Sequence, residues 1–325
     1  MFRKIEISIQ TILFTLAIIA GIWLLLQIED ILFLIFISFL LMTAIYPLVT
    51  WLERFKIPRA LGTLLTYFFV LGVLGLAVGS AVPALVAQSA TLAATLPATA
   101  SRLLPYWNIN FQTLTSQIAP LSSNVVSVTL GIFSNIFTTF MVLIITFYLI
   151  IERRSAEGIL TEFLGEAVGK QVSDILRVIE RRLGAWVRGQ LFLMICTGVL
   201  TYVGLILLHV EFALPLAIIA AILPIVPIIG PIVSAIPAVL IGVSVSPLTA
   251  LLVVILYFVI QQVVGTLLFP VVMQRSAGIS PLVTILALLI GARLGGIGGV
   301  VLAVPIVIVI QVISATFLGA KNPAS

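Results

Sequence analysis

Few residues in this sequence could do chemistry, and their types exclude most enzymes. The chain has one histidine, His209, so an HExxH zinc helix cannot form. Its only two aspartates, Asp30 and Asp174, lie outside the apolar runs, whereas an intramembrane aspartyl protease needs a pair within them. The lone Cys196 offers neither a disulfide framework nor a cysteine-rich metal site. Because a P-loop is also missing, we expect no enzymatic activity, no cofactor and no metal.

The remaining polar groups of interest lie within apolar sequence. Gln261 and Gln262 are adjacent and would point about 100° apart on a helix, so at least one must face protein or a cavity. Amides donate and accept hydrogen bonds, which suits a small polyol better than a bare cation. Arg293 lies in the glycine-rich stretch GARLGGIGG. It either reaches an interface or a lipid phosphate, or faces a transport cavity and selects an anionic or hydroxyl-rich solute.

Helix-breaking residues interrupt two of the apolar runs. The stretch LPIVPIIGPIVSAIP, residues 223–237, carries four prolines and a glycine but no charge. Broken backbone is tolerated at membrane depth only where protein buries it or where it lines a water-filled cavity. Secondary transporters place such breaks around the substrate site. The sequence therefore predicts a substrate pathway whose candidate residues are Pro224, Pro227, Gly230, Pro231, Gln261, Gln262, Pro270, Arg293, Gly295 and Gly296. The alternative is ordinary helices that are kinked by proline, with glycine pairs that permit close packing.

Composition indicates the kind of protein that holds these residues. Of the 325 residues, 62% are hydrophobic and 8% are charged, and the mean hydropathy is +1.34. A soluble domain carries roughly 25% charged residues. We therefore predict an all-α polytopic membrane protein whose main partner is the lipid bilayer, with no nucleic-acid partner.

Apolar runs of spanning length, about 20 residues, predict the membrane segments. They cover residues 7–28, 31–51, 60–82, 129–151, 190–208 and 248–270. Two further runs, 212–243 and 281–318, are longer than one crossing needs and contain central breaks. The sequence leaves open whether each long run crosses once or re-enters, and therefore on which side the C-terminus lies. We expect about eight membrane segments in total, including these broken or re-entrant ones.

The chain divides accordingly into five parts. Residues 1–82 hold three spans, 83–128 an extracytoplasmic amphipathic segment, and 129–151 the fourth span. Residues 152–188 form a cytoplasmic amphipathic segment, because apolar residues recur every three or four positions from Leu160 to Trp186. Within it Glu166 and Lys170 form an i,i+4 pair. This segment either packs on its own bundle or contacts another subunit. Residues 189–325 form the C-terminal transport region.

Basic residues predict the orientation. Twelve of the sixteen lie in three groups: Arg3 and Lys4, the loop at 54–59, and the segment 153–188. Short loops rich in Lys and Arg remain in the cytoplasm. If the predicted spans alternate, all three groups share one face, which places the N-terminus in the cytoplasm.

Several motifs in order along the whole chain resemble one family. They are YPLVTWLERFKIPRALGTLL at 46–65, VRGQLFL at 187–193, VPIIGPIVSAIPAVL at 226–240, QQVVGTLLFPVVM at 261–273 and ISPLVTILALLIGARLGGIGGVVLAVP at 279–305. With these the chain resembles the AI-2E (autoinducer-2 exporter-like) family, also called PerM-like permeases. The resemblance implies a multi-pass protein of the bacterial inner membrane with re-entrant hairpins that forms homo-oligomers, pentamers in particular. It also implies transport, of autoinducer-2 in some members and Na⁺/H⁺ exchange in others.

One departure from the family pattern bears on the function. After the paired glutamines the family usually carries an acidic residue and an asparagine, where this chain has Val264 and Gly265. An ionisable group within the membrane is costly and therefore normally functional. No Asp or Glu occurs from residue 212 onward, which argues against cation coupling through that position.

Three functions remain open from the sequence. The first is a secondary transporter or facilitator of small polar solutes, including export of autoinducer-2-like signals. The second is a monovalent cation (Na⁺ or Li⁺)/proton antiporter. The third is a non-transporting assembly or regulatory partner that acts through the 152–188 segment.

Overall fold

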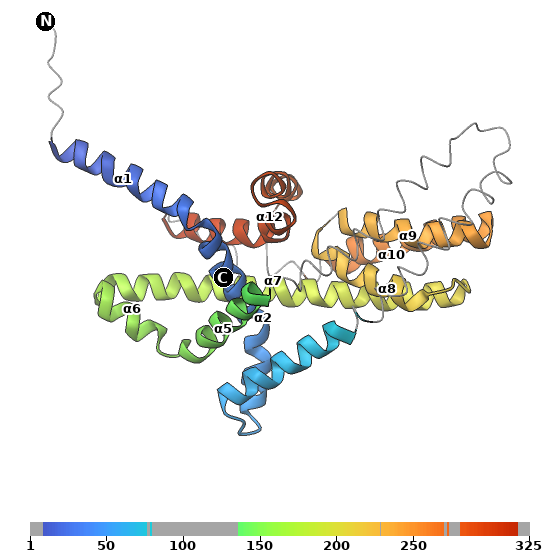
Figure 1. Cartoon of the computed structure of the whole chain (residues 1–325), viewed down its shortest axis with the longest axis horizontal. Helices are drawn as coiled ribbons and strands as arrows, with labels where there is room; N and C mark the ends of the chain where they lie inside the picture. Colours follow the sequence, from blue (N-terminus) through green and yellow to red (C-terminus); the bar gives the residue numbers. More distant parts are fainter. Residues whose placement is uncertain are drawn as a thin grey trace, which may run out of the picture.

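The fold is entirely helical wherever it is described. The computed structural model describes residues 9–76, 79, 136–227, 229–269, 272 and 280–317, and these ranges contain helices and turns without strands (Figure 1). This confirms the predicted all-α class. The segment 83–128, the basic pair Arg3 and Lys4, and the candidate Pro270 lie outside the described residues.

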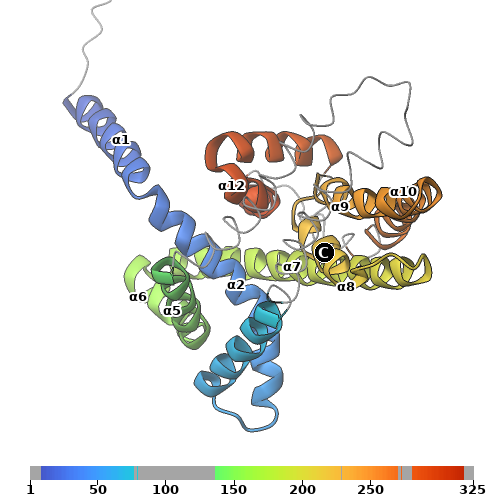
Figure 2. The same ribbon diagram turned by 45° about the vertical axis from the view of Figure 1, so that its right-hand side comes forward.

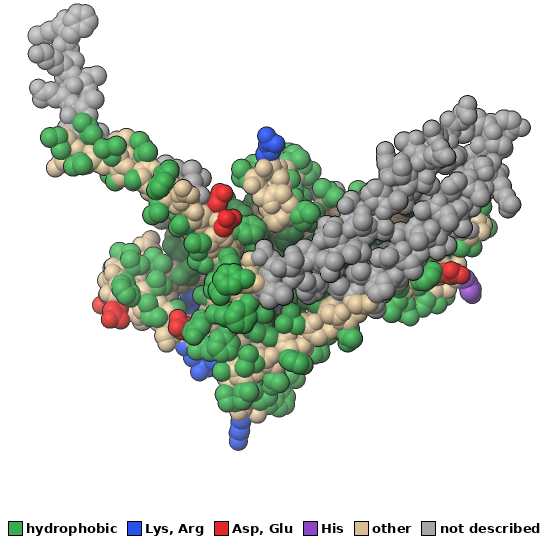
Figure 3. Space-filling view, in the orientation of Figure 1, with side chains coloured by type: hydrophobic (Ala, Val, Ile, Leu, Met, Phe, Trp, Pro, Cys, Tyr) green, Lys and Arg blue, Asp and Glu red, His purple; other side chains and the backbone are tan. Residues whose placement is uncertain are grey.

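Five described helices are long and apolar enough to cross a membrane. They are Glu29–Glu53, Arg59–Leu76, Glu166–Leu207, Pro247–Leu268 and Leu282–Thr316. Shorter apolar helices cover Ile12–Leu25, Phe137–Glu152, Ala213–Ile225 and Ile229–Val243. Hydrophobic side chains cover most of the described surface in Figure 3, and charged ones gather in small separate groups. A surface of this kind belongs in lipid.

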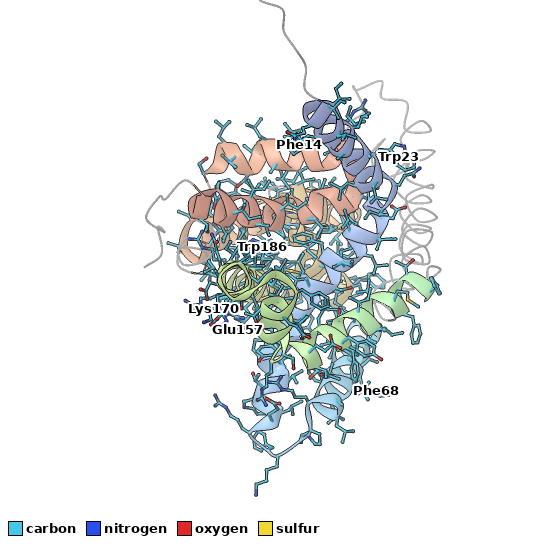
Figure 4. The ribbon with its side chains drawn as sticks, turned by 90° about the vertical axis from the view of Figure 1, so that its left-hand side faces the viewer. Phe14, Trp23, Phe68, Glu157, Lys170 and Trp186 are labelled. Atoms are coloured by element: carbon cyan, nitrogen blue, oxygen red, sulfur yellow. The ribbon has the colours of Figure 1, made fainter. Side chains whose placement is uncertain are left out.

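The first two predicted spans do not fold back on each other. Helix α1 (Ile9–Gln27) and helix α2 (Glu29–Glu53) are separated by Ile28 alone. Helical hydrogen bonds continue across the junction, from Ile28 N to Leu24 O and from Leu32 N to Ile28 O. The junction contains neither proline nor glycine, so nothing there breaks the helix. Helix α1 therefore extends away from the other helices, with Phe14 and Trp23 exposed (Figures 2 and 4).

A first core cluster joins α2, the helix at 59–76 and helix α5 (Ile136–Glu152). Its buried members are Met42, Ile45, Val49, Tyr67 and Ile150. The Tyr67 hydroxyl donates a 2.8 Å hydrogen bond to the Leu143 carbonyl in α5, which adds a polar tie to the apolar packing.

The amphipathic segment forms two helices, and the second continues beyond the segment. Helix α6 (Ala156–Leu164) ends at Gly165, whose φ of 80° suits glycine. Helix α7 (Glu166–Leu207) then runs for 42 residues, about 63 Å, through the division that we expected at residue 188. No proline interrupts it. The predicted pair forms, since Lys170 Nζ lies 2.8 Å from Glu166 Oε1.

Helix α7 connects the two remaining core clusters. Leu205, near its C-terminal end, packs with helices α8 (Ala213–Ile222), α9 (Ile229–Val245) and α10 (Pro247–Gln262). Its middle, around Leu183 and Trp186, packs with α2 and with the second half of helix α12 (Pro281–Phe317). Helix α7 therefore packs against both of the long apolar runs that contain predicted breaks.

Candidate functional site

The first apolar run that we judged too long for one crossing turns back on itself. Helix α8 has 10 residues, about 15 Å, roughly half of a hydrocarbon core of about 30 Å. A short 3₁₀ turn, η1 (Leu223–Ile225), follows, and α9 returns along α8. Leu216 and Ala220 of α8 share a buried cluster with Ala238 and Ile241 of α9. We call α8, η1 and α9 the first hairpin.

The turn of the first hairpin leaves no room for a side chain at Gly230. A β-carbon on Gly230 would lie 1.9 Å from the Leu223 carbonyl oxygen. The prolines 224, 227 and 231 surround this contact, so the turn brings four candidate pathway residues together. Proline cannot donate a backbone hydrogen bond. Backbone groups of the turn serve the Leu223, Val226 and Pro227 carbonyls, whereas the Pro224 carbonyl accepts a bond from outside the turn.

Helix α7 supplies the donor of this bond. Gln190 Nε2 donates a 2.6 Å hydrogen bond to the Pro224 carbonyl, and the Gln190 side chain is 7% exposed. A carbonyl that is buried without a partner costs about 1–3 kcal/mol. The bond thus satisfies the broken backbone and fixes the turn against α7.

Sequence reasoning assigns Gln190 no role beyond the start of a predicted span. A signal was available, because Gln190 is an amide within an apolar run and belongs to the VRGQLFL motif. Its partner, however, lies 34 residues away. No spacing rule for a single helix connects two such positions.

The paired glutamines lie on helix α10, on its outward side. The packed side of α10 carries Val253, Tyr257 and Ile260. Gln261 and Gln262 come next and are both exposed in the single chain. Neither glutamine is buried within this chain, so the expectation that at least one faces protein or a cavity stays a prediction, with a water-filled path or a second chain as the group that would receive them.

A π-helix, η2 (Val263–Leu268), follows the glutamines directly. Such wide turns occur mostly as single-turn insertions, frequently at functional sites. Val264, which occupies the usual acidic position of the family pattern, packs against the apolar cluster around Leu183 and Ile308. Gly265 is exposed. The predicted ordinary span at 248–270 thus contains a wide turn immediately after its two amides.

The second long run also turns back. Helix α12 contains a kink at Gly295 and at Gly296, whose φ of 54° and ψ of −135° require glycine. A β-carbon on Gly299 would lie 2.0 Å from the Gly291 carbonyl oxygen, so the backbones of the two halves touch. Figure 2 shows them as two separate helical segments. We call residues 281–294 and 297–317 the second hairpin.

Arg293 lies at the exposed tip of the second hairpin. Leu294 and Ile297 at the same tip are 83% and 74% exposed. A β-carbon on Gly298 would lie 2.8 Å from the ring of Phe33, which belongs to α2. The two tips therefore have different neighbours, since the first contacts α7 and the second contacts α2. The described candidate residues therefore form three separate groups: the first tip, the second tip and the glutamine pair on α10.

Comparison with known proteins places the chain among transport proteins. Its sequence matches the AI-2E family transporter profile over residues 12–319. It is 28% identical to YrrI of Bacillus subtilis, over 87% of this chain and 84% of that protein, and 31% identical to YueF of the same organism, over 82% and 78%. Both relatives are named for an inferred role in transport. TqsA of Escherichia coli, named an AI-2 transport protein, is 27% identical over 86% and 83%.

Proposed function

The chain belongs to the AI-2E transporter family, and from this premise we propose that it is a secondary transporter or facilitator of small polar solutes. The observation that carries the proposal is the first hairpin, whose proline-broken turn is buried against α7 and closed by the bond from Gln190 to the Pro224 carbonyl. Broken backbone of this kind within apolar sequence is typical of substrate sites in secondary transporters. We propose that both hairpins re-enter the membrane and that their tips move during alternating access.

The solute class follows from the side chains near the proposed path. Gln261 and Gln262 offer amide donors and acceptors, and no carboxylate occurs from residue 212 onward. An uncharged or weakly anionic polyol matches such groups better than a cation. The AI-2 transport function in the name of the relative TqsA agrees with a solute of this kind. We therefore propose autoinducer-2-like molecules as the first solutes to test.

The cation/proton antiporter is the weaker alternative. A carrier of Na⁺ or H⁺ within the membrane normally needs an ionisable group. Val264 fills the usual acidic position with an apolar side chain that packs in a core cluster. An antiporter built on this chain would have to use another residue as its carrier.

The placement of the chain in the cell is also part of the proposal. The basic residues at 54–59 and 153–188 support a cytoplasmic position for that face of the chain and a location in the bacterial inner membrane. A cytoplasmic N-terminus would also require α1 to lie back toward that face, since α1 and α2 do not fold back on each other here. The basic residues at 54–59 lie close to those that begin the 153–188 segment. Glu53 pairs with Arg59, and its carboxylate also lies 3.5 Å from the Arg154 guanidinium. The family resemblance supports a homo-oligomer, and a pentamer in particular. Either lipid or a neighbouring copy would cover the apolar side chains of α1.

The glutamine pair gives the direct test of the path. The double variant Gln261→Leu and Gln262→Leu is expected to lower solute flux in proteoliposomes by about tenfold or more, because two hydrogen bonds to the solute contribute about 1 kcal/mol each. Folding should persist, since both side chains are exposed. Gln311→Leu, a glutamine in the apolar second half of α12, is the matched control and should leave flux unchanged. Equal flux in the double variant and the control would exclude the glutamines from the path.

A further inference from the structure

A polar cavity lies between α2, the start of the α5–α6 turn and α7, apart from both hairpins. Its volume is about 260 Å³. It is lined by Thr43, Tyr46, Pro47, Arg153, Arg177, Glu180, Arg181 and Arg188. Four arginines thus surround the cavity with a single carboxylate, and they come from two elements that are distant in sequence.

The ion pairs leave the cavity positively charged. Glu180 pairs with Arg153 at 2.5 Å. Arg177 pairs with Glu157 and lies 3.8 Å from Asp174, and neither of these acids lines the cavity. Arg181 and Arg188 form no ion pair within the described part of the chain. Two guanidinium groups therefore remain available to an anion.

Close packing between α2 and α7 shapes the wall of this cavity. Pro47 lacks a backbone N–H, so the Thr43 carbonyl one turn earlier has no helical donor. A β-carbon on Gly184 would lie 3.0 Å from an Arg188 terminal nitrogen and 3.4 Å from this carbonyl oxygen. Gly184 thus lets α2 approach and leaves room for the Arg188 guanidinium beside it.

An apolar cavity adjoins the polar one. Its volume is about 270 Å³. Most of its lining is apolar, and Glu152 and Ser173 add polar groups to it. The apolar residues are Phe39, Met42, Leu149, Ala156, Ile159, Leu160 and Leu176. Arg153, Arg177 and Glu180 line both cavities. An amphipathic ligand could therefore place an anionic group among the arginines and a hydrocarbon chain beside them.

We propose that the polar cavity binds a phosphate group, and that an anionic phospholipid supplies it. The planar guanidinium forms paired hydrogen bonds with phosphate oxygens, a geometry that lysine cannot reproduce. A free phosphate ion has the same chemistry but would leave the apolar cavity unfilled. The arginines belong to the face that the sequence predicts to be cytoplasmic, where anionic lipid attracts basic residues. This site is independent of the proposed solute path.

The test measures binding by the full-length protein. The purified, delipidated chain is titrated with dioctanoyl phosphatidylglycerol, dioctanoyl phosphatidylcholine or inorganic phosphate while its thermal unfolding midpoint is followed. Phosphatidylglycerol is expected to raise the midpoint of the wild type. The double variant Arg181→Gln and Arg188→Gln should need a lipid concentration at least about tenfold higher for the same shift of the midpoint. The reason is that hydrogen bonds to charged groups contribute more than bonds between neutral groups. Without ligand this variant should unfold near the wild type, because both arginines are exposed and lack ion pairs.

Two further variants separate a built site from general attraction to charge. Arg54→Gln with Lys56→Gln removes the same charge from exposed positions outside the cavity and should bind like the wild type. Arg181→Lys with Arg188→Lys keeps the charge and should still lose affinity. Wild-type binding by both double variants at 181 and 188 would overturn the proposal. If inorganic phosphate raised the midpoint as strongly as the lipid, with the same dependence on the variants, the cavity would bind phosphate. The proposal that a phospholipid supplies the phosphate would then be wrong.

Discussion

The variant Gly230→Ala is expected to open the turn of the first hairpin and to abolish solute flux. Its new β-carbon would lie 1.9 Å from the Leu223 carbonyl oxygen, a backbone atom that cannot move aside alone. Overpacking of this kind costs about 3 kcal/mol. Because Leu223 begins the 3₁₀ turn, the displacement would also pull Pro224 away from Gln190. The measurement is the thermal unfolding midpoint of the purified protein together with flux in proteoliposomes.

A glycine in open space provides the control for this variant. A β-carbon on Gly72, in the helix at 59–76, would meet nothing within 4 Å. Gly72→Ala should therefore leave the midpoint unchanged or raise it slightly, because alanine favours a helix over glycine. A Gly230→Ala protein with wild-type midpoint and flux would show that the tight turn is not required.

The variant Gln190→Met is expected to lower flux by about tenfold while the protein still folds. Methionine is similar in size but cannot donate a hydrogen bond, so the Pro224 carbonyl is left buried without its partner. The cost is about 1–3 kcal/mol at the turn itself. Hydrogen exchange should show increased opening of the first hairpin, and flux in proteoliposomes should fall with it.

Thr197→Val is the matched control for Gln190→Met. Thr197 lies on the same helix with 6% exposure, but its hydroxyl bonds to the Leu193 carbonyl one turn earlier. That carbonyl belongs to the α7 helix, so the loss of the hydroxyl leaves the hairpin untouched. If Thr197→Val reduced flux as much as Gln190→Met, general perturbation of α7 would explain the effect, and the Gln190 bond would have no special role.

Local chemistry explains which parts of the architecture could be predicted from sequence. Proline and glycine act on the backbone of their own neighbourhood, so the sequence alone predicts the breaks at Pro224–Pro231 and at Gly295–Gly296. The all-α membrane class follows from the composition together with apolar runs of spanning length. The i,i+4 pair of Glu166 and Lys170 depended on helical spacing only, and the structure confirms it.

Tertiary contacts explain what the sequence did not reveal. The bond from Gln190 to Pro224 joins two helices, and the polar cavity combines Thr43 of α2 with Arg188 of α7. Periodicity does not report such pairings. Glu29 and Asp30 separate the two predicted spans 7–28 and 31–51 in the sequence. These residues instead occupy the first turn of α2, where the helix dipole stabilises acidic side chains.

The central claim is that this chain moves a small polar solute without coupling to cations. The most direct test is flux in proteoliposomes that contain the wild-type protein, with labelled autoinducer-2 and internal pH followed together. Proton and sodium gradients are imposed in turn and then removed. We expect solute flux that depends on neither gradient, because no Asp or Glu occurs after residue 211. Sodium-driven proton movement with no solute flux would contradict it and would identify an antiporter.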